Sequence, residues 1–222
     1  MPKMMVSVNA LKIALGDTIP ILKNTDTPSL MHVSVQSENN KIYVSCTDRY
    51  VAWTSVLTGE NVSDKRRVNI NLTIDQLLLL RAWLNFMKRN SNTVEVSITD
   101  KGIKFDPDSL VPLSLLAADC GQYPNIRNIL KGAIEDAETA EPFKEAKGFN
   151  PVLVKHIHKV KLWASGSDNR PSLLESPHGF GMIMPLRSPG LKVTTANSRE
   201  SAPGLFDDPA EVTEPEVKEP KL

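Results

Sequence analysis

The sequence predicts an α+β fold built from repeated β-α-β-β-β units, with antiparallel sheets on the outside and helices on one face. Stretches of alternating apolar and polar residues come in pairs joined by short turns, which is typical of antiparallel hairpins. Two amphipathic segments of helical length each follow a strand-like stretch. The order strand, helix, three strands occurs twice within residues 1–120, and we interpret this part as an internal repeat of about 60 residues.

The first unit is predicted over residues 4–57. Asn9 is expected to cap a helix over 10–24, because its side chain can accept a backbone N–H, and Pro20 is expected to kink that helix. Pro28 is expected to open the first of three antiparallel strands. The predicted strands are 4–8, 28–35, 42–46 and 51–57.

The second unit contains the most regular helical pattern of the chain. Thr73 is expected to cap a helix over 74–89. One side of this helix is apolar and the opposite side carries cations and asparagine, which predicts one buried face. The apolar side holds Leu77, Leu80, Leu84 and Met87, and the opposite side Arg81, Asn85, Lys88 and Arg89. The predicted strands are 68–72, 93–98, 102–105 and 110–117.

The third unit is shorter and less regular. Residues 119–131 are predicted as a connection, and 133–147 as an exposed helix or loop. Asn150 followed by Pro151 is typical of a helix start, so a helix is predicted to about Trp163. Strands are predicted over 171–174 and 180–187.

Three segments follow from this order of elements. Residues 1–121 are predicted to form a complete domain of two units, and residues 122–187 a second, reduced domain of about one unit. Residues 188–222 are rich in proline and acidic side chains without apolar periodicity, and are predicted to be a disordered acidic tail.

Charge is balanced over the whole chain but unevenly distributed. There are 26 basic and 26 acidic side chains, and the acidic excess lies in residues 191–222, which leaves residues 1–190 with a net charge of +3. The sequence shows no basic leader with a long apolar run and no stretch of the ~18–20 apolar residues that a membrane span needs. These features predict a cytoplasmic protein that does not contact membranes, with Cys46 and Cys120 as reduced thiols.

No motif of catalysis or metal binding stands out. The sequence has no GxSxG, P-loop or HExxH pattern, and no paired cysteine or histidine spacing of a zinc site. His156 and His158 would point about 200° apart on a helix, so they cannot share a metal ion. We therefore predict a protein that is not an enzyme and holds no cofactor or metal.

The predicted helices have basic faces with few acids. A solvated helix face usually mixes both signs, whereas an unmixed positive face suits phosphate contacts that do not depend on base sequence. Contact with DNA and an ordinary solvated face both remain open from this pattern alone.

Four stretches resemble the bacterial DNA polymerase III β subunit, the sliding-clamp family. They are Thr47-Asp48-Arg49-Tyr50-Val51-Ala52, Leu115–Asp119 continuing to Tyr123-Pro124-Asn125-Ile126-Arg127, Gly148-Phe149-Asn150 with its following helix, and Met184-Pro185-Leu186-Arg187. The match spans residues 5–187 with gaps. The order of these four stretches, together with the repeated units, indicates the family more specifically than any one motif does.

The resemblance implies a clamp fold whose helices line a hole around double-stranded DNA. It further implies a pocket for a short peptide, ending in apolar residues such as Leu-Phe, from DNA polymerase or other replication proteins. The implied DNA-facing residues are Lys12, Arg81, Lys88, Arg89, Lys155 and Lys159. The implied pocket residues are Thr47, Arg49, Tyr50, Ala52, Pro124, Asn128, Ile129, Met184, Pro185, Leu186 and Arg187.

The sequence departs from the family at three points. The family has glycine where Arg49 stands and arginine where Asn128 stands. A family subunit has six half-units, and only three are predicted here.

Two hypotheses follow: a reduced clamp that encircles DNA as a homo-oligomer, or a clamp-like adaptor or decoy that binds replication peptides without forming a ring. In addition, Leu205-Phe206 in the tail resembles the end of a peptide that clamps bind. One hypothesis is that this segment occupies the peptide pocket of its own chain or of a neighbour and inhibits partner binding. The simpler and favoured interpretation is a chance dipeptide in a disordered segment.

Overall fold

The computed structural model describes residues 3–38, 40–60, 67–87, 92–107, 111–121, 123–138, 150–163 and 171–185. The first unit contains β1 (Lys3–Ser7), α1 (Val8–Lys23), the 3-10 turn η1 (Pro28–Leu30), β2 (His32–Glu38), β3 (Lys41–Thr47) and β4 (Val51–Thr58). The second contains β5 (Val68–Thr73), α2 (Ile74–Phe86), β6 (Thr93–Thr99), β7 (Gly102–Asp106) and β8 (Leu113–Leu116). The remainder contains α3 (Ile126–Glu138), η2 (Pro151–Leu153), β9 (Lys161–Trp163), β10 (Ser172–Ser176) and β11 (Gly179–Ile183).

Two antiparallel sheets are formed by an exchange of strands between the first two units. One sheet has the order β1-β6-β7-β8 and the other β5-β2-β3-β4-β11-β10-β9. The first strand of each unit therefore pairs with the other unit, as in the partners Met5 and Glu95 and the partners Val35 and Ile70. The predicted α+β class and antiparallel repeat are confirmed. The exchange of β1 and β5 between the two units was not predicted, because it depends on pairing between strands that are far apart in the sequence.

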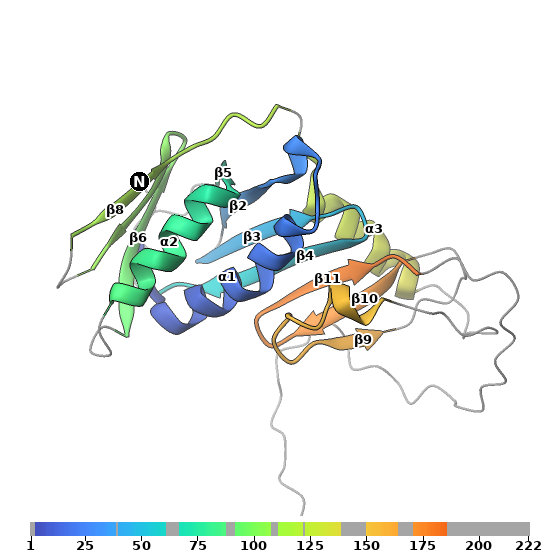
Figure 1. Ribbon diagram of the computed structural model, residues 1–222. Coiled ribbons are helices and arrows are strands. Elements are labelled where there is room, and N and C mark those ends of the chain that lie inside the picture. The colour runs from blue at the N-terminus through green and yellow to red at the C-terminus, as the bar shows by residue number, and fades with distance from the viewer. Residues whose placement is uncertain are drawn as a thin grey trace, which may run out of the picture.

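The helices α1 and α2 lie side by side on one face of the sheets (Figure 1). Thr73 caps α2 as predicted, in a capping box with Gln76, since each side chain bonds the other residue's backbone N–H. The predicted Asn9 cap of α1 is wrong. Because the helix begins at Val8 directly after β1, Ser7 is the cap and Asn9 already lies in the first turn. The helix also continues past Pro20 to Lys23.

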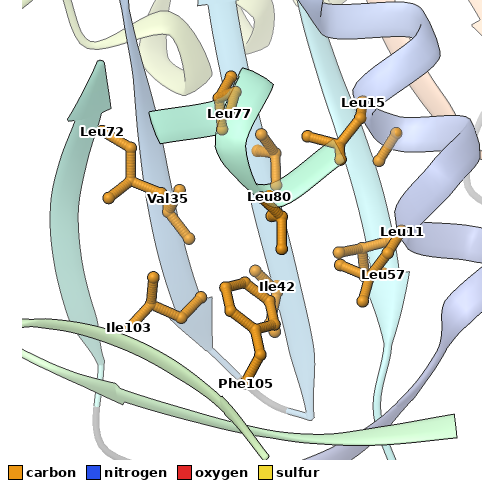
Figure 2. A pocket seen from close by; sticks show the side chains of 12 residues that line it. Leu11, Leu15, Val35, Ile42, Leu57, Leu72, Leu77, Leu80, Ile103 and Phe105 are labelled. Carbon is orange, nitrogen blue, oxygen red and sulfur yellow. The ribbon is translucent and has the colours of Figure 1, made fainter. Parts of the chain in front are cut away.

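The apolar side chains of α1, α2 and both sheets form one core. A cavity of about 30 Å³ lies inside it, lined by side chains from both helices and both sheets (Figure 2). Leu11, Leu80 and Phe105 are among the lining residues, and all twelve are apolar. The lining offers no hydrogen-bond partner to a water molecule or a polar ligand, so the void is a small gap in the packing of the core.

The strands β11, β10 and β9 extend the first unit's sheet from its β4 edge. Gly179 and Gly181 of β11 lie against Trp53, and a Cβ added at Gly181 would come within 2.3 Å of the Ala52 carbonyl oxygen and 2.7 Å of the Trp53 ring. Trp53 is fully buried and donates its indole N–H to the Ser55 hydroxyl at 2.9 Å. The spacing of these glycines thus lets β11 pass close over a large aromatic side chain.

Several helices and strands begin or end at residues other than those predicted. Pro28 opens η1 instead of a strand, and β2 begins at His32. The predicted connection over 119–131 contains the start of α3, with Asn125 accepting the Asn128 N–H at 3.2 Å. The ends of the predicted helix 74–89 and strand 180–187 lie outside the described residues, as do 139–149 and the tail.

The predicted helix over 150–163 is wrong. Asn150 does accept the Val152 N–H at 3.1 Å, but only the turn η2 follows. The His158 N–H is bonded to the Asp17 carboxylate of α1, and β9 pairs with β10. Tertiary partners therefore satisfy backbone groups that a helix would have satisfied locally.

Candidate nucleic-acid and peptide interfaces

The turn between β3 and β4 is organised by the buried carboxylate of Asp48. Its Oδ1 accepts the N–H groups of Tyr50 at 2.9 Å and Val51 at 2.7 Å, and its Oδ2 accepts the Asn24 side-chain amide at 2.6 Å. The carboxylate thus uses both oxygens to hold the turn, which fixes the start of β4 relative to the end of α1.

Thr47 and Arg49 complete this turn. The Thr47 hydroxyl donates to the Val51 carbonyl at 2.8 Å and accepts the Arg49 N–H at 3.2 Å. Arg49 has a φ of 81°, in the left-handed region that glycine adopts most readily. Its guanidinium donates to the Thr27 hydroxyl at 2.7 Å, so the side chain is tied back toward the loop after α1.

The end of β11 lies directly beside this turn. The Met184 N–H donates to the Tyr50 carbonyl at 2.8 Å. Both side chains are large and open to solvent, with Tyr50 59% and Met184 38% exposed. Pro185 follows half-buried, and Leu186 and Arg187 lie outside the described residues. The structure therefore joins two of the predicted pocket segments, which are far apart in sequence.

The third predicted pocket segment lies on α3, which covers the opposite face of the seven-stranded sheet from α1 (Figure 1). Val51 and Trp53 point into the main core, whereas Ala52 between them packs with Ile126 and Leu130 of α3. Ala52 is only 3% exposed, so it is covered by the chain itself and is not an open pocket residue as the resemblance implied.

The remaining predicted pocket residues lie at the first turn of α3 or just before it. Pro124 is half-buried, and its carbonyl accepts the Ile126 N–H at 2.9 Å. Asn128 is exposed, and Ile129 is 45% exposed. The Tyr123 hydroxyl donates to the Ser45 carbonyl at 3.2 Å, and burial raises the pKa of this phenol. These contacts bring the start of α3 onto β3 and β4.

Arg127 fixes α3 to the sheet. Its guanidinium donates to Gln36 at 2.7 Å and to the Glu38 carboxylate at 2.6 Å. The same group stacks over the Tyr43 ring, 4.1 Å from the centroid. The hydrogen bond from Arg127 lowers the pKa of Glu38. The sequence showed Arg127 in a motif without indicating this anchoring role.

Two of the four described cations assigned to DNA are carried by α1 and α2. Lys12 on α1 and Arg81 on α2 are both exposed. Lys155 and Lys159 are exposed as well, but they come from the turns after η2 and not from a helix. Lys88 and Arg89 lie outside the described residues.

The segment that carries Lys155 and Lys159 is held to α1 by Asp17. This carboxylate is 1% exposed, and its Oδ1 accepts the His158 N–H at 2.9 Å. Burial raises the pKa of Asp17 to about 6. Burial also lowers the pKa of His156, whose Nε2 has no hydrogen-bond partner among the described residues. The contact holds the segment 150–160 against α1.

No protein-family model matches the chain, and no curated protein matches it in sequence. Solved structures do match. The DNA polymerase III β subunit of Thermotoga maritima superposes with a TM-score of 0.58 at 10% identity, over 85% of this chain and 65% of that one. The sliding clamp of Bacillus subtilis gives 0.60 at 16% identity, over 84% and 64%. The sliding clamp of Pseudomonas aeruginosa gives 0.63 at 11% identity, over 85% and 67%.

This chain has the sliding-clamp fold. It spans about two thirds of the length of the clamp subunits it matches. At this identity the likeness establishes the arrangement of strands and helices, and the predicted clamp architecture is confirmed at that level.

Two features of the structure were not predicted from the sequence. Leu79 and Phe86 of α2 are 53% and 75% exposed, so the open side of that helix is partly apolar. Their spacing of seven residues on the outer side was the available signal. Asp17 was also missed, because a single acid among apolar residues gives no sign of its partner.

Among the described residues, no group of three or more His, Cys, Asp or Glu side chains is arranged to hold a metal ion. Within the same part of the chain, no helix is both long enough and apolar enough to cross a membrane. Burial raises the pKa of the Cys46 thiol, which opposes thiolate chemistry there.

Proposed function

We propose that this protein is a clamp-like DNA replication protein, a binding protein and not an enzyme. It contacts duplex DNA through the exposed cations on the α1 and α2 side and binds a short apolar peptide of DNA polymerase or another replication protein beside β11. The observation that carries the proposal is the junction of the β3–β4 turn, the end of β11 and the start of α3 within a clamp fold.

The peptide site is assigned to Tyr50, Met184 and Ile129. These apolar side chains are exposed on segments that the sheet and α3 hold in place. Arg49, Thr47 and Asn128 supply polar groups at its border, and Pro124 shapes the entry to α3. Exposed apolar side chains with a few fixed polar groups suit an extended peptide that ends in apolar residues.

The peptide site is tested with a fluorescent peptide that ends in Leu-Phe. Tyr50→Ala and Met184→Ala are expected to weaken binding at least about tenfold, because each removes a large contact surface. Thr58→Ala, at the other end of β4, serves as the matched control and is expected to bind like the parent chain. If all three variants bind the peptide with equal affinity, the proposed peptide site is wrong.

DNA contact is tested by retention on circular and linear duplexes. A ring-forming protein stays on a circle and slides off a linear duplex, whereas simple surface binding gives equal retention. Absence of binding to either DNA at low salt would exclude the DNA part of the proposal.

A second candidate is an adaptor or decoy that binds replication peptides without encircling DNA. It is favoured by the exposure of Tyr50 and Met184, since both side chains come from one chain and need no ring to form the peptide site. This candidate predicts peptide binding by a protein that stays monomeric in solution. Measurement of solution mass therefore separates the two candidates.

A further inference from the structure

The exposed face of α1 is a narrow stripe without acidic side chains. Asn9, Lys12, Gly16 and Lys23 are the exposed residues of this helix, and Pro20 is half-buried. At about 100° of rotation per residue, these positions fall within about 80° of one another around the helix axis. The stripe therefore presents two lysines on one surface, with a glycine and a proline between them.

The fold itself gives no reason for a glycine at position 16. A glycine in the middle of a helix is less stable than an alanine, because its backbone loses more freedom on folding. Gly16 lies within α1, and a Cβ there meets nothing within 4 Å. Neither packing nor a left-handed backbone thus requires this glycine. The other use of a glycine is to let a ligand come close to the backbone.

Pro20 changes the same stripe by removing a backbone donor. In a helix the N–H of residue 20 pairs with the carbonyl of residue 16, but proline has no N–H. The Gly16 carbonyl therefore lacks its usual helical donor, and no side chain at this position covers it. Such an acceptor is unfavourable opposite a phosphate oxygen, whereas it suits water or the amino group of a base. The middle of the stripe thus suits a groove of DNA.

The two lysines are spaced for the two edges of such a groove. With a rise of about 1.5 Å per residue, Lys12 and Lys23 lie about 16 Å apart along the helix axis. The major groove of DNA is about 12 Å wide, and lysine ammonium groups sit on long flexible stems. A lysine in the last turn also suits the helix dipole, so the spacing and not the presence of Lys23 is the informative feature.

We propose that α1 crosses a groove of duplex DNA, with Gly16 at the point of closest approach and with Lys12 and Lys23 on the phosphates at either edge. Lys23 is thereby added to the cations assigned to DNA. Gly16 is a positioning residue, because the absence of a side chain keeps the helix close enough for both lysines to reach. The inference rests on the proposed DNA function and adds which part of the duplex faces α1.

The test compares Gly16 with a matched glycine, Gly132 of α3. Gly132 is also exposed, a Cβ there meets nothing within 4 Å, and α3 covers the opposite face of the sheet (Figure 1). Gly16→Gln and Gly132→Gln are both expected to raise the unfolding midpoint, since glutamine favours a helix more than glycine does. Only Gly16→Gln is expected to weaken duplex binding at low salt, by at least about tenfold in fluorescence anisotropy, because its side chain holds α1 away from the groove.

Opposite effects on stability and on DNA affinity separate a positioning role from a structural one. A variant that is more stable than the parent chain cannot owe its loss of DNA affinity to unfolding. A lower unfolding midpoint of Gly16→Gln would show that the fold requires this glycine, and would overturn the inference. Equal duplex affinity of Gly16→Gln and the parent chain would overturn it as well.

The contact of Lys23 is tested by the salt dependence of binding. Lys23→Ala is expected to reduce the slope of log affinity against log salt by about 1, because one phosphate contact is lost. Lys41→Ala removes an exposed cation at the start of β3 and is expected to leave the slope unchanged. An unchanged slope for Lys23→Ala, with the parent chain bound to DNA, would contradict this inference alone. A parent chain that binds no duplex would contradict the proposed DNA function and the inference with it.

Discussion

Single buried polar groups determine how the elements of this clamp fold meet. Asp48 holds the β3–β4 turn with both carboxylate oxygens, and Asp17 fixes the segment 150–160 to α1. The two carboxylates differ in their hydrogen bonds. Both oxygens of Asp48 accept at least one, whereas Asp17 Oδ2 has no hydrogen-bond partner among the described residues. Asp17 therefore combines a positioning role with an energetic penalty for its charge.

Asp17→Asn is expected to change the pH dependence of stability. Burial raises the pKa of Asp17 to about 6, above its ordinary value of 3.8. A raised pKa means that the folded state binds its proton more tightly than the unfolded state does. The stabilisation from this group is thus complete below pH 3.8 and is lost as the pH rises through about 6.

Asparagine keeps an oxygen for the His158 N–H and removes the charge. We expect Asp17→Asn to gain about 1–2 kcal/mol relative to the parent chain at pH 7.5, and little or nothing near pH 4. Urea unfolding of both proteins at several pH values measures this difference. A stability difference that is independent of pH would show that Asp17 carries no such linkage.

At the scale of elements, each face of the seven-stranded sheet receives a different helix. Val51 and Trp53 of β4 pack toward α1, and Ala52 packs under α3. The β11 strand completes this layer only because its glycines clear Trp53. The docking of α3 and of β11 together determines whether the proposed peptide site exists.

Gly181→Ala is expected to displace β11. The added Cβ would lie 2.3 Å from the Ala52 carbonyl oxygen, and backbone cannot move aside as a flexible side chain can. We expect a loss of about 2 kcal/mol or more in unfolding free energy, with loss of Leu-Phe peptide binding. Gly16→Ala on α1 is the control: a Cβ there meets nothing within 4 Å, and a gain of about 0.5–1 kcal/mol is expected. Unchanged stability of Gly181→Ala would contradict this packing.

Arg127→Ala is expected to loosen α3. The substitution removes the ion pair with Glu38 and the stacking on Tyr43, for a loss of about 1 kcal/mol. Hydrogen exchange of the α3 amides is expected to quicken more than that of α1. Lys41→Ala, which removes the same charge from an exposed position at the start of β3, is expected to leave exchange in α3 unchanged. Equal protection of α3 in both variants would show that apolar packing alone holds this helix.

At the scale of the whole molecule, the clamp fold separates two surfaces. The exposed Lys12 and Arg81 lie on α1 and α2, the junction of Tyr50 and Met184 lies at the end of the β4–β11 pair, and α3 packs on the opposite face of the sheet. If both proposed sites exist, their separation leaves each accessible while the other is occupied.

DNA affinity is expected to fall as salt rises, because phosphate contacts release counterions. Lys12→Ala, Arg81→Ala, Lys155→Ala and Lys159→Ala are each expected to reduce the slope of log affinity against log salt by about 1, without dependence on base sequence. Fluorescence anisotropy with two duplexes of unrelated sequence measures both effects. A slope that no variant alters would place the DNA contact elsewhere or exclude it.

The sequence by itself determined the local elements and their order. Alternation predicted the strands from β3 to β7 to within one residue, and Thr73 predicted the start of α2, because these signals depend on near neighbours. Tertiary structure decided the exchange of β1 and β5, the burial of Ala52 under α3, and the replacement of a predicted helix over 150–163 by turns and a strand. In each case the deciding partner is distant in sequence, as Asp17 is from His158, and the local pattern carries no record of it.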